Sequence, residues 1–223
     1  MKIYRKNDAL VVNMDDIASG WEQWVLMVSD VHFDSTHCDR QLLKKHFDEA
    51  LEKNALIFSF GDWFDAMGGK WDKRSTKADI RPEYQRTDYF TAIVEDSAKW
   101  LQPYKNNIAL ISDGNHETSI LLRHEFNILD NLVDAMGGTA HRGKYAGFIR
   151  FKFQRSNQRN SRIMYYTHGS GGTSPVTKGA IATNRRQDNV HADFYVSGHI
   201  HSELELPRPQ TRLNEQCKVE VHK

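Results

Sequence analysis

The sequence is poor in three features that mark specialised protein classes: cysteine, charge of one sign and long apolar runs. Two cysteines, Cys38 and Cys217, are too few for a disulfide framework and favour free thiols in a reducing cytoplasm. The 30 basic residues nearly balance the 29 acidic ones, so the chain as a whole does not attract nucleic acid or an anionic membrane, although a local basic groove stays open. The longest apolar runs are far too short to cross a bilayer, and the first residues show no signal-peptide pattern. We therefore expect a cytoplasmic protein with no membrane partner.

The composition and the periodicity indicate one globular domain over residues 1–223. Apolar runs of strand length alternate with helix-like stretches, which favours an α/β fold with parallel strands. The predicted strands are 24–29, 55–60, 107–112, 148–153, 162–167, 193–197 and 218–222. The predicted helices are 39–54, 84–101 and 121–136, the last of which stops at Gly137 and Gly138. Two polar segments interrupt this pattern: a lid or substrate loop at 68–86 and a hairpin tip at 155–162.

Five of the predicted strands are followed by side chains that can bind metals. They are Asp30-Val31-His32, Gly61-Asp62-Trp63-Phe64-Asp65, Asp113-Gly114-Asn115-His116-Glu117, His168-Gly169 and Gly198-His199-Ile200-His201. Taken singly, each motif is also explained by a turn, a helix cap or a structural histidine. Taken together, they point to one site, because the carboxyl ends of strands on one side of a parallel sheet converge. Nitrogen and oxygen donors without cysteine suit manganese, iron or zinc and argue against a closed structural zinc site.

The order D-x-H, G-D-x-x-D, G-N-H-E, H-G and G-H-x-H resembles the calcineurin-like metallophosphoesterase family, and the resemblance covers residues 30–201. It implies a four-layer α/β/β/α sandwich of two mixed sheets flanked by helices, with the site at the carboxyl ends of the strands. It also implies two divalent metal ions, manganese in the first place and iron, zinc or nickel as alternatives. The first ion would be held by Asp30, His32, Asp62 and His201, and the second by Asp62, Asn115, His168 and His199.

The resemblance further implies a division of roles. Asp62 bridges the two ions, and a hydroxide between them attacks phosphorus in line with the departing oxygen. His116 is not needed as a ligand and assists the leaving group, with Asp65 orienting its imidazole. Only 22 residues follow His201, fewer than the resemblance implies, so we expect either a small second sheet or an abbreviated C-terminus.

The motifs do not identify the substrate. The near-neutral charge favours a phosphorylated small molecule or nucleotide, as a monoester or diester, over a nuclease acting on DNA or RNA. A non-catalytic interaction module is less favoured because no ligand position is missing. Basic and aromatic residues outside the motifs are candidate substrate contacts, although a solvated surface explains them somewhat better: Lys70, Trp71, Arg74, Arg185 and Arg186.

Overall fold

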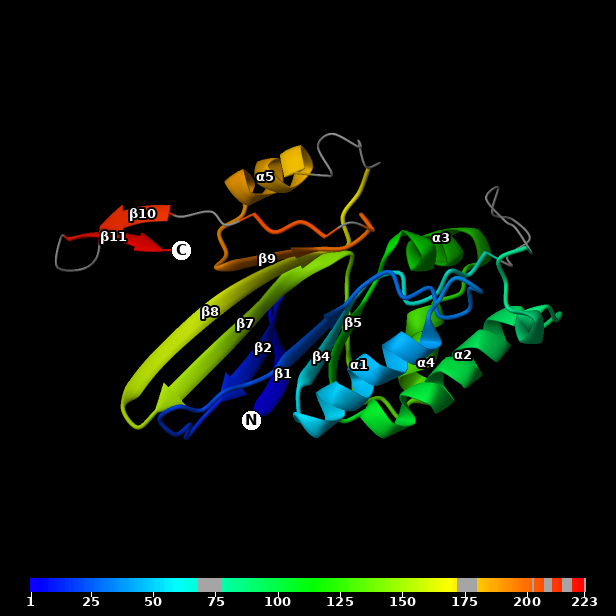
Figure 1. Ribbon diagram of the computed structural model, residues 1–223, viewed down its shortest axis with the longest axis horizontal. Coiled ribbons are helices and arrows are strands. Elements are labelled where there is room, and N and C mark those ends of the chain that lie inside the picture. Colours follow the sequence, from blue (N-terminus) through cyan, green and yellow to red (C-terminus); the bar gives the residue numbers. More distant parts are fainter. Residues whose placement is uncertain (68–77, 172–179, 202, 207–209, 214–217, 223) are drawn as a thin grey trace.

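The computed structural model describes residues 1–67, 78–171, 180–201, 203–206, 210–213 and 218–222, and its first half is built on a parallel sheet (Figure 1). The strands are, in spatial order, β3 (Val25–Val28), β4 (Leu56–Phe60), β5 (Ile108–Ser112) and β6 (His141–Gly143). Strands β4 and β5 are buried along their whole length because both of their faces are covered, as is usual in parallel sheets. The predicted α/β class with parallel strands is confirmed.

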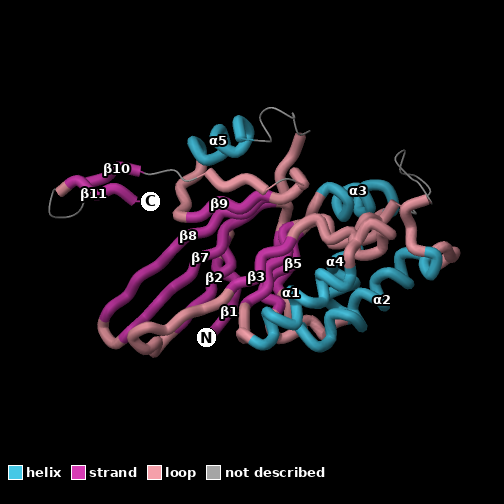
Figure 2. Tube along the Cα trace, in the orientation of Figure 1, coloured by secondary structure: helices cyan, strands magenta, loops and turns pink. Residues whose placement is uncertain are grey.

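Helices pack on one face of this sheet (Figure 2). They are α1 (Arg40–Glu52), α2 (Tyr89–Leu101), α3 (Asn115–His124) and α4 (Ile128–Ala135), with 3-10 turns at Pro82–Tyr84 and Gln102–Tyr104. The prediction of one helix over 121–136 is wrong. Glu125 has a left-handed φ of 52°, which ends α3, and the Asn127 side chain caps the start of α4. The predicted stop at Gly137 and Gly138 is confirmed, since both follow α4 with positive φ.

The second sheet has five strands and is mixed. Its spatial order is β1 (Lys2–Lys6), β2 (Ala9–Met14), β7 (Ala146–Arg155), β8 (Gln158–Thr167) and β9 (Phe194–Ser197). The pairs β2–β7 and β8–β9 are parallel, and the pairs β1–β2 and β7–β8 are antiparallel. Both sheets were expected to be mixed, but the four-stranded one is parallel throughout. The hairpin tip expected at 155–162 is also shorter, because β8 begins at Gln158.

Two apolar cores hold the layers together. One lies between the helices and the four-stranded sheet and includes Phe47, Ile57 and Leu132. The other lies between the two sheets and includes Phe58 and Ile149. Neighbouring residues of a strand point to opposite faces, which is why Ile57 and Phe58 serve different cores. The described chain is thus layered as helices, parallel sheet and mixed sheet (Figure 2).

Three further elements lie beside this body. Helix α5 (Ala180–Asn189) lies above β9 in Figure 1. Strands β10 (Gln210–Leu213) and β11 (Val219–His222) form a hairpin of their own, so the strand predicted at 218–222 is confirmed but adds to neither large sheet in the described chain. Most of the segment predicted as a lid, 68–77, is outside the described residues. Its remainder folds onto the body: Tyr84 is buried and Arg81 donates to the carbonyls of Ser35 and Cys38.

Candidate metal centre

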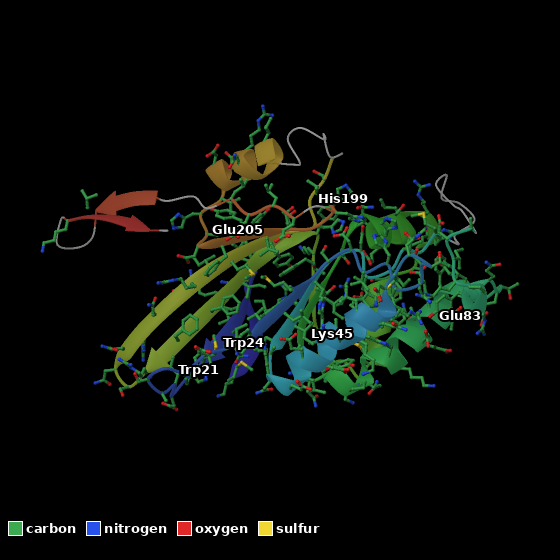
Figure 3. The ribbon with its side chains drawn as sticks, in the orientation of Figure 1. Trp21, Trp24, Lys45, Glu83, His199 and Glu205 are labelled. Atoms are coloured by element: carbon green, nitrogen blue, oxygen red, sulfur yellow. The ribbon has the colours of Figure 1, made fainter. Side chains whose placement is uncertain are left out.

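The five predicted motifs meet at one end of the molecule, although they come from two sheets. The first three follow β3, β4 and β5 of the parallel sheet, and the last two follow β8 and β9 of the mixed sheet. The expectation that one parallel sheet carries all five is therefore wrong. Because the sheets pack face to face, the carboxyl ends of these five strands still share one edge of the sandwich. Figure 3 shows His199 at this edge, close to α3.

Donor atoms of six of the seven predicted ligands fall into two groups that fit metal ions. One group comprises Asp30, Asp62, His168 and His199, and the other comprises Asp30, His32 and His201. Within each group the donor atoms lie within 4.8 Å of one another. The seventh predicted ligand, Asn115, joins the first group because its Oδ1 lies 3.0 Å from His168 Nε2. Asp30, rather than Asp62, is the residue common to both groups.

His168 shows how the chain aims a ligand. Its side chain is fully buried, and its Nδ1–H donates to the carbonyl of Phe60 at 3.0 Å. The opposite nitrogen, Nε2, lies 3.0 Å from Asp62 Oδ2 and 3.9 Å from Asp30 Oδ1. A carbonyl on one ring nitrogen is the usual way to fix a metal-binding histidine with its other nitrogen facing the ion.

Negative charge from the carboxylates predominates at this centre. Burial lowers the pKa of His168, but the hydrogen bond and the charge of Asp62 outweigh burial and raise that pKa above its usual value. Burial likewise opposes ionisation of Asp62, yet His168 and His116 hold the pKa of Asp62 below its usual value. Two nearby carboxylates that draw protons onto histidines form a site that a cation would stabilise.

The backbone at the site adopts a conformation that side chains other than glycine rarely take. Asp30, His32, Asp62 and His199 have φ values of 54°, 48°, 52° and 70°. Left-handed backbone at a non-glycine residue costs about 1 kcal/mol or more and persists where the surroundings enforce it. Such strain concentrates at functional sites, so its presence at four of the predicted ligands supports a shared role.

A buried carboxylate behind the ligands holds two of the motifs together. Glu117 accepts the backbone N–H groups of Asp62, Phe64 and Gly114 at 3.0, 3.1 and 2.8 Å. Burial, followed by the charge of Asp62, raises the pKa of Glu117 to about 7. The sequence suggested only a helix cap for Glu117, because its bonds to the β4 loop reach across more than fifty positions of the chain.

Asp65 lies between two histidines. Its Oδ1 is 3.2 Å from His32 Nδ1 and 3.5 Å from His116 Nδ1, and His116 Nδ1 is also hydrogen-bonded to the backbone carbonyl of Asp65. Burial lowers the pKa of His32, but Asp65 outweighs it and raises that pKa. Besides the predicted pairing of Asp65 with His116, Asp65 thus contacts the predicted ligand His32, which the motifs did not indicate.

Asp34 holds the loop that carries Asp65 in place. It is buried and accepts the backbone N–H groups of Asp65 and Ala66 at 2.7 and 3.0 Å, and also the hydroxyl of Tyr89. Burial raises its pKa. Asp34 lies two residues beyond the D-x-H motif and was not predicted. The sequence signal that could have identified Asp34 is the presence of a second acidic residue shortly after the motif.

Within the part of the chain that the structure describes, none of the residues predicted to contact the substrate is placed at the candidate metal centre. Lys70, Trp71 and Arg74 lie outside the described ranges. Arg185 is exposed on α5, and Arg186 lies on the same helix with a side chain outside the description.

Comparison of the chain with protein-family models, with curated proteins and with solved structures finds no match in any of the three. Within the described ranges, no helix combines the length and the apolar character needed to span a membrane.

Proposed function

We propose that this protein is a metal-dependent hydrolase of phosphate esters, with two divalent ions, manganese in the first place, held between its two sheets. The observation that carries the proposal is the convergence of seven nitrogen and oxygen donors beside a further histidine, His116, that is paired with Asp65. The donor set fits such ions, since it offers carboxylates, imidazoles and one amide but no thiolate. The four-layer sandwich belongs to the same proposal, with α5 as the outer helix beside β9.

When bound, divalent ions lower the pKa of water to give a nucleophile at neutral pH and neutralise charge on phosphoryl oxygens. The chain supplies the rest. Asp30 and Asp62 hold negative charge where the ions belong, and the Phe60 carbonyl keeps His168 Nε2 directed at them. As the oxygen of a water that has lost one proton to solvent bonds to phosphorus, the bond from phosphorus to the leaving oxygen breaks. His116 provides the proton that the leaving oxygen takes up.

His116 is placed for this role, although its ring also falls in a third group of possible metal ligands with His32 and Asp65. Its Nδ1 is engaged by Asp65, and its Nε2 lies 3.7 Å from Asp62 Oδ2, at the edge of the donor groups. Its backbone N–H donates to Asp62 Oδ1 at 2.9 Å, which ties its position to a carboxylate of the first donor group. A histidine beside a phosphoryl site, oriented by a carboxylate, is equipped to act as a general acid.

The deciding experiment is metal content and turnover measured on the same preparation. Protein loaded with manganese should bind two ions by elemental analysis and hydrolyse a chromogenic phosphomonoester or phosphodiester, and a single-stranded oligonucleotide should be assayed in parallel. Two ions bound with no turnover on any substrate would instead support a non-catalytic interaction module. No metal bound at all would overturn the proposal.

The metal site does not distinguish a small phosphorylated molecule from a polynucleotide, and we infer the substrate class from the surface of the mixed sheet. The near-neutral charge favoured a small phosphorylated molecule or nucleotide. The distribution of that charge on the mixed sheet favours the alternative, a polynucleotide.

A further inference from the structure

The two faces of the mixed sheet differ sharply in chemistry. The inner face packs on the parallel sheet and is apolar, with Leu10, Ile149 and Met164 in one row across neighbouring strands. Because side chains alternate along a strand, the residues directly before and after each of these three point to the outer face. In the pairing register, one outer row runs through Lys6, Ala9, Phe148, Tyr165 and Tyr195.

The outer face is basic. Its strand positions carry five basic side chains and no acidic one: Lys2, Lys6, Arg150, Lys152 and Arg159. All but Lys152 are exposed, and none of the five makes an ion pair within the described part of the chain. Acidic residues lie in loops around it: Asp8 in the turn between β1 and β2, Asp15, which accepts a hydrogen bond from the side chain of Asn13 on β2 at 2.6 Å, and Asp193, which accepts the backbone N–H of Ile163 at 2.7 Å. A chain that is nearly neutral overall therefore concentrates positive charge on one sheet.

Aromatic rings interleave with these charges. The rings of Phe148 and Tyr165 lie 5.2 Å apart, and Tyr4 on the edge strand is 37% exposed. Phe148 also lines a hollow of about 320 Å³ together with Lys6, Arg150, His191 and the acidic Asp8. Rings beside cations on an open sheet can stack bases while the cations hold phosphates.

The basic face leads toward the metal centre. Strands β8 and β9 end at the ligands His168 and His199. Tyr165 precedes His168 by three residues, which is about 10 Å along a strand. Helix α5 lies at the β9 end of the sheet, where Tyr195 contacts the carbonyl of Val190 (Figure 1). The ring of Phe148 and the cations of β1 and β7 lie on the other side of β8.

We propose that the outer face of the mixed sheet binds single-stranded nucleic acid and leads it to the metal centre. An extended polyanion matches cations on β1, β7 and β8, three of the four adjacent strands β1, β2, β7 and β8, and unpaired bases match the rings, which paired bases inside a duplex could not reach. The assignment of the bound strand as substrate rests on the proposed phosphoesterase function, whereas the binding itself does not.

The test is fluorescence anisotropy of labelled 20-nucleotide DNA and RNA strands, with a chelator present to prevent cleavage. The face variant R150E/K152E should weaken binding at least tenfold and flatten the dependence of log K on log salt by about 1.4, since each lost phosphate contact removes about 0.7 for a single strand. Phe148→Leu keeps apolar volume without the ring and should weaken binding about fivefold with an unchanged salt dependence. Comparison of the DNA and RNA arms identifies the natural strand.

The matched control is K45E/K99E, which makes the same charge change on exposed lysines of α1 and α2, in the opposite layer; Lys45 is labelled in Figure 3. It should bind as wild type does, and thermal melting of all variants checks folding. Equal binding by the face and control variants would overturn the proposal, and so would equal affinity for blunt duplex DNA or heparin.

Turnover of a small chromogenic ester by the metal-loaded wild-type protein, set beside its strand binding, separates the two proposals. Ester hydrolysis without strand binding would remove the nucleic-acid face and leave the phosphoesterase. Strand binding without ester hydrolysis would remove the phosphoesterase proposal and leave the nucleic-acid face.

Discussion

The carboxylate of Glu117 accepts the backbone N–H of Asp62, although 55 positions separate the two residues. Through this bond and those to Phe64 and Gly114, the first turn of α3 and the loop after β4 become one buried unit. Glu117, which caps a helix, thus also fixes the position of Asp62, a predicted metal ligand.

Glu117→Ala should lower the free energy of unfolding by about 3 kcal/mol, because three buried N–H groups lose their acceptor. Urea denaturation of the metal-free protein measures this. Glu52→Ala, at an exposed position of α1, should change stability by less than about 0.5 kcal/mol. Comparable losses in the two variants would show that the Glu117 bonds contribute nothing specific.

Gly114→Ala tests close packing at the same place. The φ of Gly114 is −113°, which any residue can adopt, but an added Cβ would collide with the backbone and carboxylate of Asp62. We expect a loss of about 1–3 kcal/mol from overpacking, together with weaker manganese binding. Denaturation and metal titration together check this. Normal metal affinity in a folded Gly114→Ala variant would contradict the tight contact with Asp62.

His116→Gln and Asp65→Asn should fail in different ways. His116→Gln should keep both metals and lose about 10²–10⁴ in kcat, because only the leaving-group proton is affected. Asp65→Asn should lose turnover and also bind metal more weakly, since Asp65 contacts the ligand His32 as well as His116. Steady-state kinetics and elemental analysis distinguish the two. Full metal affinity in Asp65→Asn would limit Asp65 to its partnership with His116.

Metal removal should destabilise the protein. Manganese would relieve the repulsion between Asp30 and Asp62, and ligand at about 100 times Kd adds about 2.7 kcal/mol to the stability of the folded state. Thermal melting with manganese and with chelator measures the difference. In Asp62→Asn the difference should be much smaller, whereas His46→Ala, at an exposed position on α1, should preserve it. A midpoint that manganese leaves unchanged in the wild-type protein would argue against the metal centre.

The sequence was informative where the signal is local. Each ligand motif is a few residues long and follows an apolar run, so Asp30, Asp62 and His168 could be chosen without knowledge of the fold. The strands themselves are predictable for the same reason, since β4 and β5 are continuous apolar runs bounded by polar residues. The break between α3 and α4 was missed because it depends on the left-handed backbone of Glu125, a residue without a preference for that conformation.

Features that depend on distant pairing could not be read from the chain. Nothing local assigns β8 and β9 to a different sheet from β4 and β5. Strand β1 is too polar to stand out, whereas the apolar run of β2 is a local signal that the prediction missed. Asp34 and Glu117 act through backbone groups 31 to 55 positions away, so their roles appear only once the loops are folded together. The basic face was invisible to net charge, because only the pairing register sorts lysines and arginines onto one side of a sheet.

The origin of the ligands in two sheets sets the order in which the site can be completed. Asp30 accepts the backbone N–H of His199 at 2.9 Å across 169 positions of the chain. A growing chain that has been made only as far as β8 contains Asp30, His32, Asp62 and Asn115 but neither His199 nor His201. On the proposed assignment of two ions, full metal loading would wait until β9 has docked beside β8, so that acquisition of both ions would report that the last strand of the mixed sheet is in place.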